Sequence, residues 1–300
     1  MRTPSTQSRE GLLLVSLAAL SWGTIGVAVS MLYNVAATNP SSIGFLRLLI
    51  AAPALLLLCR WMVGADFWRV RREHLLPMGM IGAAMAGYQL FYFAAIPYLG
   101  VAAAVMINIC SAPIFTALIA TLFLGERLHW STWLALLGAI GGTLLLVGGA
   151  PEATTPSELW TGAALALGAG FSYSLVALGG RVVAPHYHPL QPITLAFSLG
   201  ALLLLPSALA TGLVVSYPPS GWLLLIYLGL VPTALAYGLY LRGLRSISAT
   251  VATILSLIEP LGSTLLAILL LGEQLTGSAL IGMLLLLCSM ILLYLRRDGS

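Results

Sequence analysis

Two ionisable side chains lie deep within apolar stretches of this 300-residue chain, and the first is a carboxylic acid. Glu259 stands twelve residues into the stretch 248–271 and directly precedes Pro260. A charged side chain at the centre of a membrane helix costs at least about 2.5 to 3.5 kcal/mol on insertion scales and usually has a function. We therefore expect Glu259 to accept a proton or to bind a substrate ammonium group. The alternative is a carboxyl group that stays neutral or bonds a neighbouring helix.

Arg47 is the basic counterpart, about two turns into the apolar stretch 41–62. Its long side chain can extend to the membrane surface along its own stem, or it can bond a carbonyl group of another helix. We expect one of these two roles. Binding of a substrate carboxylate, or pairing with Glu259, is the alternative.

Six aromatic residues with polar tips form a second group of candidates. In a hydrated cavity a flat ring can stack on a ligand while its hydroxyl or indole N–H makes a hydrogen bond. Two pairs among the six stand three or four positions apart, a spacing that puts both rings on one face of a helix. As a set they predict an aromatic or amphipathic ligand, whereas any single one is equally explained by packing between helices. The six residues are Trp22, Tyr88, Tyr92, Tyr173, Tyr237 and Tyr240.

Pro113 and Pro260 occupy the same position in two copies of one segment. Residues 111–128 and 258–275 match at eight of eighteen positions, so the chain contains a duplication. Proline lacks the N–H that a helix interior needs, and interrupted helices in corresponding positions of two repeats often hold the substrate site of a transporter. We expect a helix break or hinge at both prolines.

Other polar residues accompany these prolines. Asn108 and Ser111 stand one turn apart just before Pro113. They are further binding candidates, equally explained as hydrogen bonds between helices. Glu126 and Glu273 each follow a glycine of the kind that ends a helix. We interpret both as helix ends, with a gating role as the alternative.

The elements that carry these residues are predicted to be membrane helices. Of all residues 60% are hydrophobic and 7% are charged, and the mean hydropathy is +1.02, far from the composition of soluble domains. Apolar stretches recur along the chain, each near the roughly 20 residues that a helix needs to cross about 30 Å of hydrocarbon. The ten predicted helices are 11–33, 41–62, 75–96, 101–124, 131–149, 159–183, 190–211, 220–241, 248–271 and 276–295.

All thirteen basic residues are arginine, and their placement predicts the topology. Apart from Arg47, they lie before the first predicted helix, after the tenth and at every second loop. Because cytoplasmic loops are enriched in basic residues, we expect both termini to be cytoplasmic. The formal net charge of +4 is then a topology signal. No soluble basic face is left for a nucleic acid, so we expect no such partner.

Ten helices in two copies give five per copy, so the second copy must enter the membrane from the opposite side. We predict an all-α integral membrane protein built of two inverted five-helix repeats, 11–149 and 159–295. Such a bundle has two near-equivalent states in which one half is open while the other is closed. This is the geometry that alternating access requires.

Each repeat has a mid-helix proline followed by a helix-ending Leu-Gly-Glu, at Pro113 with 124–126 and at Pro260 with 271–273. Over about residues 11–295 the chain resembles the EamA family of the drug/metabolite transporter superfamily, and within it the YddG-type exporters of aromatic and other amino acids. The resemblance implies a secondary carrier of the bacterial inner membrane that moves small metabolites outward through a central cavity. The helix of Arg47 is not among those implied to line it. The lining helices are 11–33, 75–96, 101–124, 159–183, 220–241 and 248–271.

We therefore expect a secondary transporter that exports amino acids, aromatic and other neutral ones, or similar small metabolites. Its expected partners are the lipid bilayer and a small-molecule substrate, with protons as a candidate coupling ion. An exporter of cationic drugs is the alternative within the superfamily, although the small multidrug relatives place an acid in the first helix, where this chain has Trp22.

Other functional classes fit the sequence less well. An intramembrane enzyme would need a catalytic partner for Glu259, and a channel would be less expected to have an inverted repeat. A Walker A site requires a lysine, and the chain has none. We expect no enzyme activity, no cofactor and no metal site.

Overall fold

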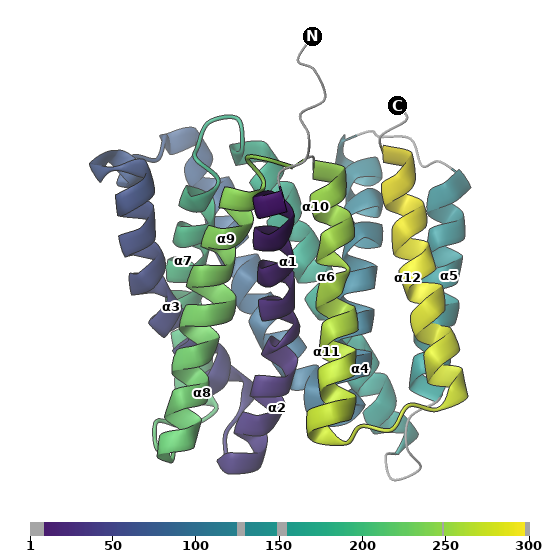
Figure 1. The fold of residues 1–300 in the computed structure, drawn as a ribbon. Helices are drawn as coiled ribbons and strands as arrows, with labels where there is room; N and C mark the ends of the chain where they lie inside the picture. The colour runs from purple at the N-terminus through teal and green to yellow at the C-terminus, as the bar shows by residue number, and fades with distance from the viewer. Residues whose placement is uncertain (1–8, 125–129, 149–154, 248, 298–300) are drawn as a thin grey trace.

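A computed structural model of the protein describes residues 9–124, 130–148, 155–247 and 249–297 (Figure 1). These residues form helices that lie roughly side by side, and no strand occurs among them. In chain order they are α1 (Arg9–Gly23), α2 (Ile25–Val35), α3 (Pro40–Val63), η1 (Ala65–Trp68), η2 (Arg72–His74), α4 (Leu75–Leu124), α5 (Trp130–Gly148), α6 (Pro156–Val183), α7 (Leu190–Ala210), α8 (Pro219–Gly229), η3 (Leu230–Leu235), α9 (Ala236–Gly243), α10 (Ala249–Ser256), α11 (Ile258–Leu271) and α12 (Gly277–Arg297).

Helix α1 begins, and α12 ends, at the end of the bundle that is uppermost in Figure 1. We call this the terminal end. At the opposite end the chain passes from α2 to α3 and from α11 to α12. Helices α5 and α12 pack together at one edge.

The described segments have the composition of a multi-pass membrane protein, as predicted. Six of them are long and apolar enough to cross a membrane, and the shorter apolar helices are Trp133–Gly148, Ile258–Leu271 and Gly277–Leu292. The number of crossings remains a prediction. The six long segments are Arg9–Val35, Pro40–Val63, Arg72–Leu122, Pro156–Val183, Leu190–Ala210 and Pro219–Gly243.

Helix α4 consists of two arms that meet at Gly100. This glycine has a φ of 76°, a left-handed conformation that other residues rarely adopt. Both arms then lie along α6, because Gly170 of α6 packs against Ser111 in one arm and Gly179 packs against Ile81 in the other. The absence of a side chain at Gly170 lets the two helices approach closely.

The second arm of α4 is capped by a side chain from the other half of the chain. The Glu273 carboxylate accepts hydrogen bonds from the backbone N–H groups of Val101, at 2.6 Å, and Ala102, at 3.1 Å. Carboxylates are favourable at helix starts because they satisfy free N–H groups and complement the helix dipole. This cap ties the end of α11 to the turn at Gly100, at the end opposite the terminal end.

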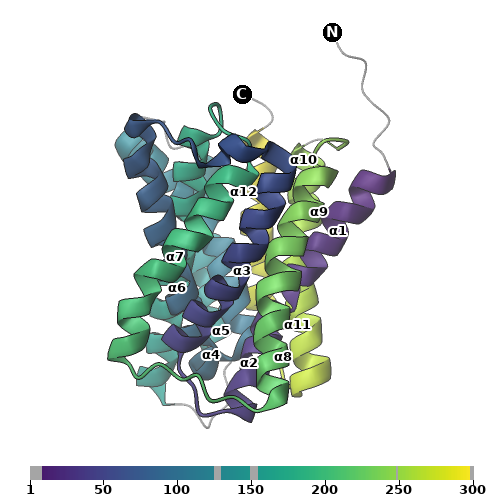
Figure 2. The same ribbon diagram turned by 90° about the vertical axis from the view of Figure 1, so that its left-hand side faces the viewer.

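Three of the apolar segments are interrupted in mid-course, two of the six long ones and the segment formed by α10 and α11. The first breaks at Thr24, between α1 and α2, and another at Leu257, between α10 and α11. Between α8 and α9 the chain forms a π-helix, η3. The first of these segments contacts each of the other two, and Figure 2 shows α1, α9, α10 and α11 gathered on one side of the bundle. We call the three interrupted segments, α1 with α2, α8 with η3 and α9, and α10 with α11, the interrupted wall. We call α4 with α6 the continuous wall.

The expected break at Pro113 is wrong for this structure, whereas a break does occur near Pro260. Helix α4 has helical backbone angles through Pro113, and its one non-helical interior residue is Gly100. A proline removes one helical hydrogen bond, which neighbouring helices can compensate in a membrane bundle. In the second copy the interruption lies at Leu257, three residues before Pro260. The duplicated prolines therefore do not have equivalent backbones.

Candidate functional site

A cavity of about 280 Å³ lies where the two walls face each other. It collects residues from both halves of the chain and from both arms of α4. Every candidate named from the sequence lines it except Tyr92, Ser111 and Pro260. The lining residues are Trp22, Ile25, Arg47, Met85, Tyr88, Gln89, Asn108, Ile109, Ala112, Pro113, Thr116, Tyr173, Ala177, Phe197, Pro232, Tyr237, Tyr240, Ser256, Glu259 and Met290.

Arg47 faces this cavity and does not extend along its helix to the membrane surface. Its side chain is only 3% exposed. Nη1 donates to the Gln89 side-chain oxygen at 2.9 Å, and Nη2 donates to the Thr233 hydroxyl at 3.2 Å. The expected outward extension or carbonyl contact is therefore wrong, because two side chains from other helices offer acceptors in the interior. Helix α3 thus contributes to the cavity, contrary to what the family resemblance implied.

The position of Thr233 follows from the proline before it. In a regular helix the residue at position 232 would donate its N–H to the Leu228 carbonyl, but proline has none. The Thr233 hydroxyl donates to that carbonyl instead, at 2.8 Å. The same hydroxyl oxygen then accepts from Arg47. Pro232, the π-helix and the orientation of Arg47 therefore form one connected arrangement.

One nitrogen of Arg47 has no partner in the structure. The buried Nε lies without any hydrogen-bond acceptor within reach among the described residues. A buried unpaired donor on a charged group is costly. Because the guanidinium lines the cavity, a ligand in the cavity can supply the missing acceptor.

Glu259 is the acidic residue of the cavity. Its side chain is partly buried. The carboxylate makes no hydrogen bond or ion pair with any described residue, including Arg47. It lies in the first turn of α11, where the helix dipole favours a negative charge. An acid and a base therefore line one small cavity without a direct hydrogen bond or ion pair between them.

The breaks at Thr24 and Leu257 meet beside Glu259. A methyl group added to Gly23 would lie 2.9 Å from the Glu259 carbonyl oxygen, so only glycine allows this approach of α1 to α11. The Thr24 hydroxyl donates to the Ser21 carbonyl at 2.7 Å, and the Thr24 backbone N–H donates to the same carbonyl at 3.2 Å. The Thr24 hydroxyl also bonds the Tyr227 hydroxyl of α8 at 2.7 Å. A side chain thus adds hydrogen bonds at the break on this wall.

The predicted aromatic residues separate into two clusters. In the first, the ring of Trp22 lies 5.4 Å from that of Tyr237 and 5.2 Å from that of Tyr240, while Phe197 packs edge-on against Tyr237. Such centroid distances are typical of stabilising ring contacts. This cluster is formed by α1, α7 and α9.

The second cluster lies on the continuous wall. The ring of Tyr88 is 5.9 Å from that of Tyr92, in a stacked arrangement, and 5.4 Å from that of Tyr173. Tyr92 is 2% exposed and does not line the cavity, so it acts as backing for Tyr88. Each cluster joins a residue of the first half of the chain to one of the second half.

The remaining candidates differ in their positions, and Asn108 has a buried side-chain amide whose N and O atoms have no hydrogen-bond partner among the described residues. The Ser111 hydroxyl donates to the Asn108 carbonyl within α4 and packs against Gly170. Asn108 lines the cavity, whereas Pro260 is buried and does not line it. Glu126 lies outside the described residues.

Three polar or aromatic participants were missed by sequence reasoning. Gln89 and Thr233 hold Arg47, and Phe197 extends the first aromatic cluster. Gln89 is an amide in an apolar stretch, a signal of the same kind as Asn108. Thr233 directly follows a proline, a position at which its hydroxyl can replace the missing N–H.

Comparison with known proteins places these features in a family. The sequence model of the EamA-like transporter family matches residues 9–148 and again residues 160–295. An uncharacterized transporter of Bacillus subtilis, YwfM, is 32% identical over 286 residues, which cover 94% of this chain and 92% of the relative. A probable terminal-alkyne amino-acid exporter of Streptantibioticus cattleyicolor is 26% identical over 176 residues, 58% of each chain.

A solved crystal structure resembles the fold over nearly its whole length. It aligns with a TM-score of 0.65 at 23% identity and covers 96% of this chain and 98% of the other. At this identity the likeness concerns the arrangement of the helices alone.

Proposed function

The chain belongs to the EamA-like transporter family, and we propose that it is a secondary exporter of neutral, preferentially aromatic amino acids. The observation that carries this proposal is the pair of opposite charges in one cavity. Arg47 and Glu259 both line it and do not pair with each other. A zwitterionic amino acid would place its carboxylate at Arg47 and its ammonium group at Glu259.

The backbone beside Glu259 supports an ammonium site. Pro260 has no N–H to donate to the Ser256 carbonyl, one turn earlier, and Ser256 lines the cavity. A carbonyl oxygen and a carboxylate together suit a group with three N–H donors. On the other side, the free Nε of Arg47 suits a carboxylate, since hydrogen bonds between ionised groups are about twice as strong as neutral ones.

The aromatic clusters and the cavity size define the substrate side chain. Tyr88 and Tyr173 on one wall, and Trp22 and Tyr237 on the other, offer ring faces to a flat side chain. The volume of about 280 Å³ is at the lower limit of the roughly 300 to 1,000 Å³ of pockets for drug-sized ligands. A single amino acid therefore suits the cavity better than a large drug.

Export of cationic drugs is disfavoured by the position of Arg47. A cation that binds at Glu259 would share a small, partly desolvated cavity with a guanidinium group, and like charges repel strongly where water is scarce. The relative named as a probable terminal-alkyne amino-acid exporter also supports an amino-acid substrate over a cationic drug.

The transport cycle that we propose is alternating access between two inverted five-helix repeats, ten membrane helices in all. Both termini would lie on the cytoplasmic side of the bacterial inner membrane, so the terminal end would face the cytoplasm. Substrate would enter there, and the Glu273 cap would close the opposite end. Because Glu259 is the one acid of the cavity, protons that compete with the substrate for its carboxylate would couple export to a pH gradient.

Counterflow in proteoliposomes tests the proposal. Vesicles loaded with phenylalanine would take up labelled phenylalanine, with phenethylamine, which lacks the carboxylate, and 3-phenylpropionate, which lacks the ammonium group, as competitors. Each lost charge removes a charge-assisted bond of about 1.5 to 3 kcal/mol, so each analogue should compete about tenfold to hundredfold less well than phenylalanine. The same assay with and without a pH gradient measures proton coupling.

The outcomes separate the alternatives. Phenethylamine that competes as well as phenylalanine would show that the carboxylate is not recognised and would favour the cationic-drug exporter. Exchange of none of the neutral amino acids would refute the substrate class. Leucine, a neutral amino acid without a ring, isolates the contribution of the aromatic clusters.

A further inference from the structure

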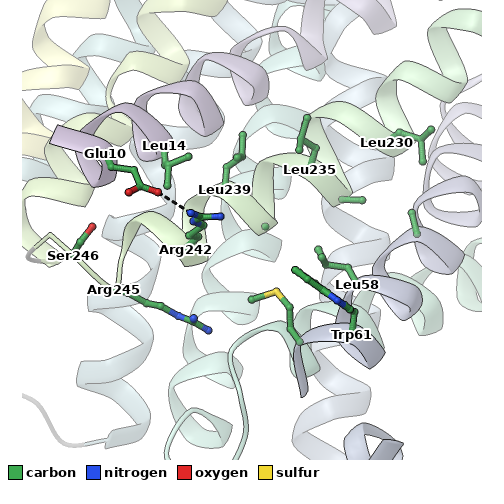
Figure 3. A pocket seen from close by; sticks show the side chains of 14 residues that line it. Glu10, Leu14, Leu58, Trp61, Leu230, Leu235, Leu239, Arg242, Arg245 and Ser246 are labelled. Atoms are coloured by element: carbon green, nitrogen blue, oxygen red, sulfur yellow. Dashed lines mark hydrogen bonds and ion pairs between the residues drawn. The ribbon is translucent and has the colours of Figure 1, made fainter. Parts of the chain in front are cut away.

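A second and larger hollow lies outside the cavity described above, between α1, α3, η3 and α9. It has a volume of about 910 Å³ (Figure 3). Its long walls are apolar, and its polar residues gather near the terminal end of α1 and α9. We call it the lateral groove. The apolar residues that form most of its surface are Leu14, Ala54, Leu58, Met62, Leu235 and Leu239.

The polar end of the lateral groove carries an excess of positive charge. Arg242 is paired with Glu10 at 2.8 Å. Arg245 is exposed, makes no ion pair with a described residue, and points away from that pair toward the side on which Trp61 stands. The polar end thus contains two guanidinium groups and one carboxylate. This end is complementary to an anion.

The depth of the groove matches one leaflet of a membrane. It extends along η3 and α9 from Arg242 to Leu230, twelve residues, or about 18 Å at 1.5 Å per residue. Half of the hydrocarbon thickness of a bilayer is about 15 Å. Trp61, beside Leu58 in Figure 3, is 83% exposed, as expected of an aromatic residue near the lipid headgroups. The arginines therefore lie at headgroup depth and η3 near the midplane.

We propose that the lateral groove binds an anionic phospholipid from the leaflet at the terminal end. Its phosphodiester would lie against Arg245, and an acyl chain would lie along Leu58 and Leu239. A phospholipid with an ammonium headgroup fits less well, since that group would meet the guanidinium groups of Arg242 and Arg245. A lipid would use both the positive charge at the polar end and the apolar walls of the groove. A free phosphate would use only the positive charge.

The lipid would contact the segment that also builds the central cavity. Leu230 and Leu235 of η3 line the lateral groove, while Pro232 lines the cavity and Thr233 bonds Arg47. A bound acyl chain thus packs on one face of the π-helix whose other face positions the guanidinium.

Native mass spectrometry of the purified protein tests this site. The probes are phosphatidylglycerol and phosphatidylethanolamine with identical acyl chains, and glycerol phosphate as the headgroup without chains. The variants are Arg245→Gln, which removes the unpaired charge, and Leu239→Trp, which fills the groove. Arg72→Gln is the matched control, since Arg72 is an exposed arginine of η2 outside the groove.

We expect phosphatidylglycerol to bind at least about fivefold more tightly than phosphatidylethanolamine, as about 1 kcal/mol per basic residue near anionic lipid implies. Arg245→Gln should abolish this preference, Leu239→Trp should weaken both lipids, and Arg72→Gln should change neither. Equal binding of the two lipids, an unchanged preference in Arg245→Gln, or glycerol phosphate binding as tightly as phosphatidylglycerol would overturn the site. So would a dimer that forms without lipid and is lost in Leu239→Trp, since a second copy would then occupy the groove.

Discussion

The two walls of the central cavity are built in different ways. The continuous wall, α4 with α6, keeps regular helical geometry at the level of the cavity. The interrupted wall has a break at Thr24, a π-helix at η3 and a break at Leu257. There, the Thr233 hydroxyl takes the place of the N–H that Pro232 lacks, and the Thr24 hydroxyl adds a hydrogen bond at its break. Side-chain bonds can exchange partners more readily than a helical ladder, so this is the wall that we expect to move.

The charged chemistry is divided between the walls, whereas the aromatic chemistry is shared. Tyr88 and Tyr173 offer ring faces from the continuous wall and Trp22 and Tyr237 from the interrupted wall, but the acid, Glu259, lies on the interrupted wall. Arg47 bonds to both walls, through Gln89 and Thr233. A substrate that touches all of these groups connects a fixed surface to a movable one.

The largest effect is expected from Glu259→Gln, which removes the negative charge of the interrupted wall without changing its shape. Phenylalanine exchange in proteoliposomes should fall about tenfold to hundredfold, because the ammonium group loses a charge-assisted bond. Glu73→Gln, at an exposed glutamate of η2, is the matched control and should exchange normally. Exchange at the wild-type rate in Glu259→Gln would remove this residue from the mechanism.

Thr233→Val should have the next largest effect, on stability. The change leaves the Leu228 carbonyl without its donor and Arg47 without one acceptor, a cost of about 1 to 3 kcal/mol. Thr194→Val is the matched change in α7, where the hydroxyl donates to the Leu190 carbonyl of an unbroken helix. Melting temperatures in detergent should fall clearly more for Thr233→Val. Equal decreases in melting temperature for the two variants would show that the interrupted wall does not depend on the Thr233 hydroxyl.

Glu273→Gln tests the contact that joins the two walls at the end opposite the terminal end. Glutamine keeps one acceptor for Val101 or Ala102 but loses the charge that favours a helix start, about 1 kcal/mol. We expect a small loss of thermal stability. Glu158→Gln, at the exposed start of α6, changes the same chemistry without joining the walls and should cost less. A larger loss of thermal stability in Glu158→Gln than in Glu273→Gln would contradict the role of the Glu273 cap in joining the walls.

Pro113→Ala should have the smallest effect, because α4 is already helical at this position. Alanine restores the N–H for the Ile109 carbonyl, and phenylalanine exchange should change less than about threefold. Pro232→Ala is the matched change on the interrupted wall and should reduce exchange much more, since a regular helix would displace the Thr233 hydroxyl. A strong loss of exchange in Pro113→Ala would restore the hinge that the duplication suggested.

The helical membrane architecture could be predicted from composition and from the length of the apolar stretches, because both are set by the bilayer. The aromatic residues and Glu259 could also be predicted to line a cavity, since residues with polar groups are few in such apolar stretches. Tyr88, Tyr173, Tyr237 and Trp22 do line one cavity.

The backbone interruptions and the direction of Arg47 could not be predicted from local sequence. Pro113 and Pro260 occupy corresponding positions of the repeat, yet only one lies near a break, because the packing of Gly23 against α11 is a contact between distant segments. Arg47 turns inward because Gln89 and Thr233 offer acceptors there. Neither acceptor is close to it in the sequence.

Hydrogen–deuterium exchange with and without saturating phenylalanine tests the difference between the walls most directly. We predict that substrate slows amide exchange in peptides that contain Thr24, η3 and Leu257. Peptides from α4 around Tyr88 and Pro113, and from α6 around Tyr173, should exchange slowly and equally in both conditions. Equal protection of both walls, or protection confined to α4 and α6, would contradict a cavity with one movable and one fixed wall.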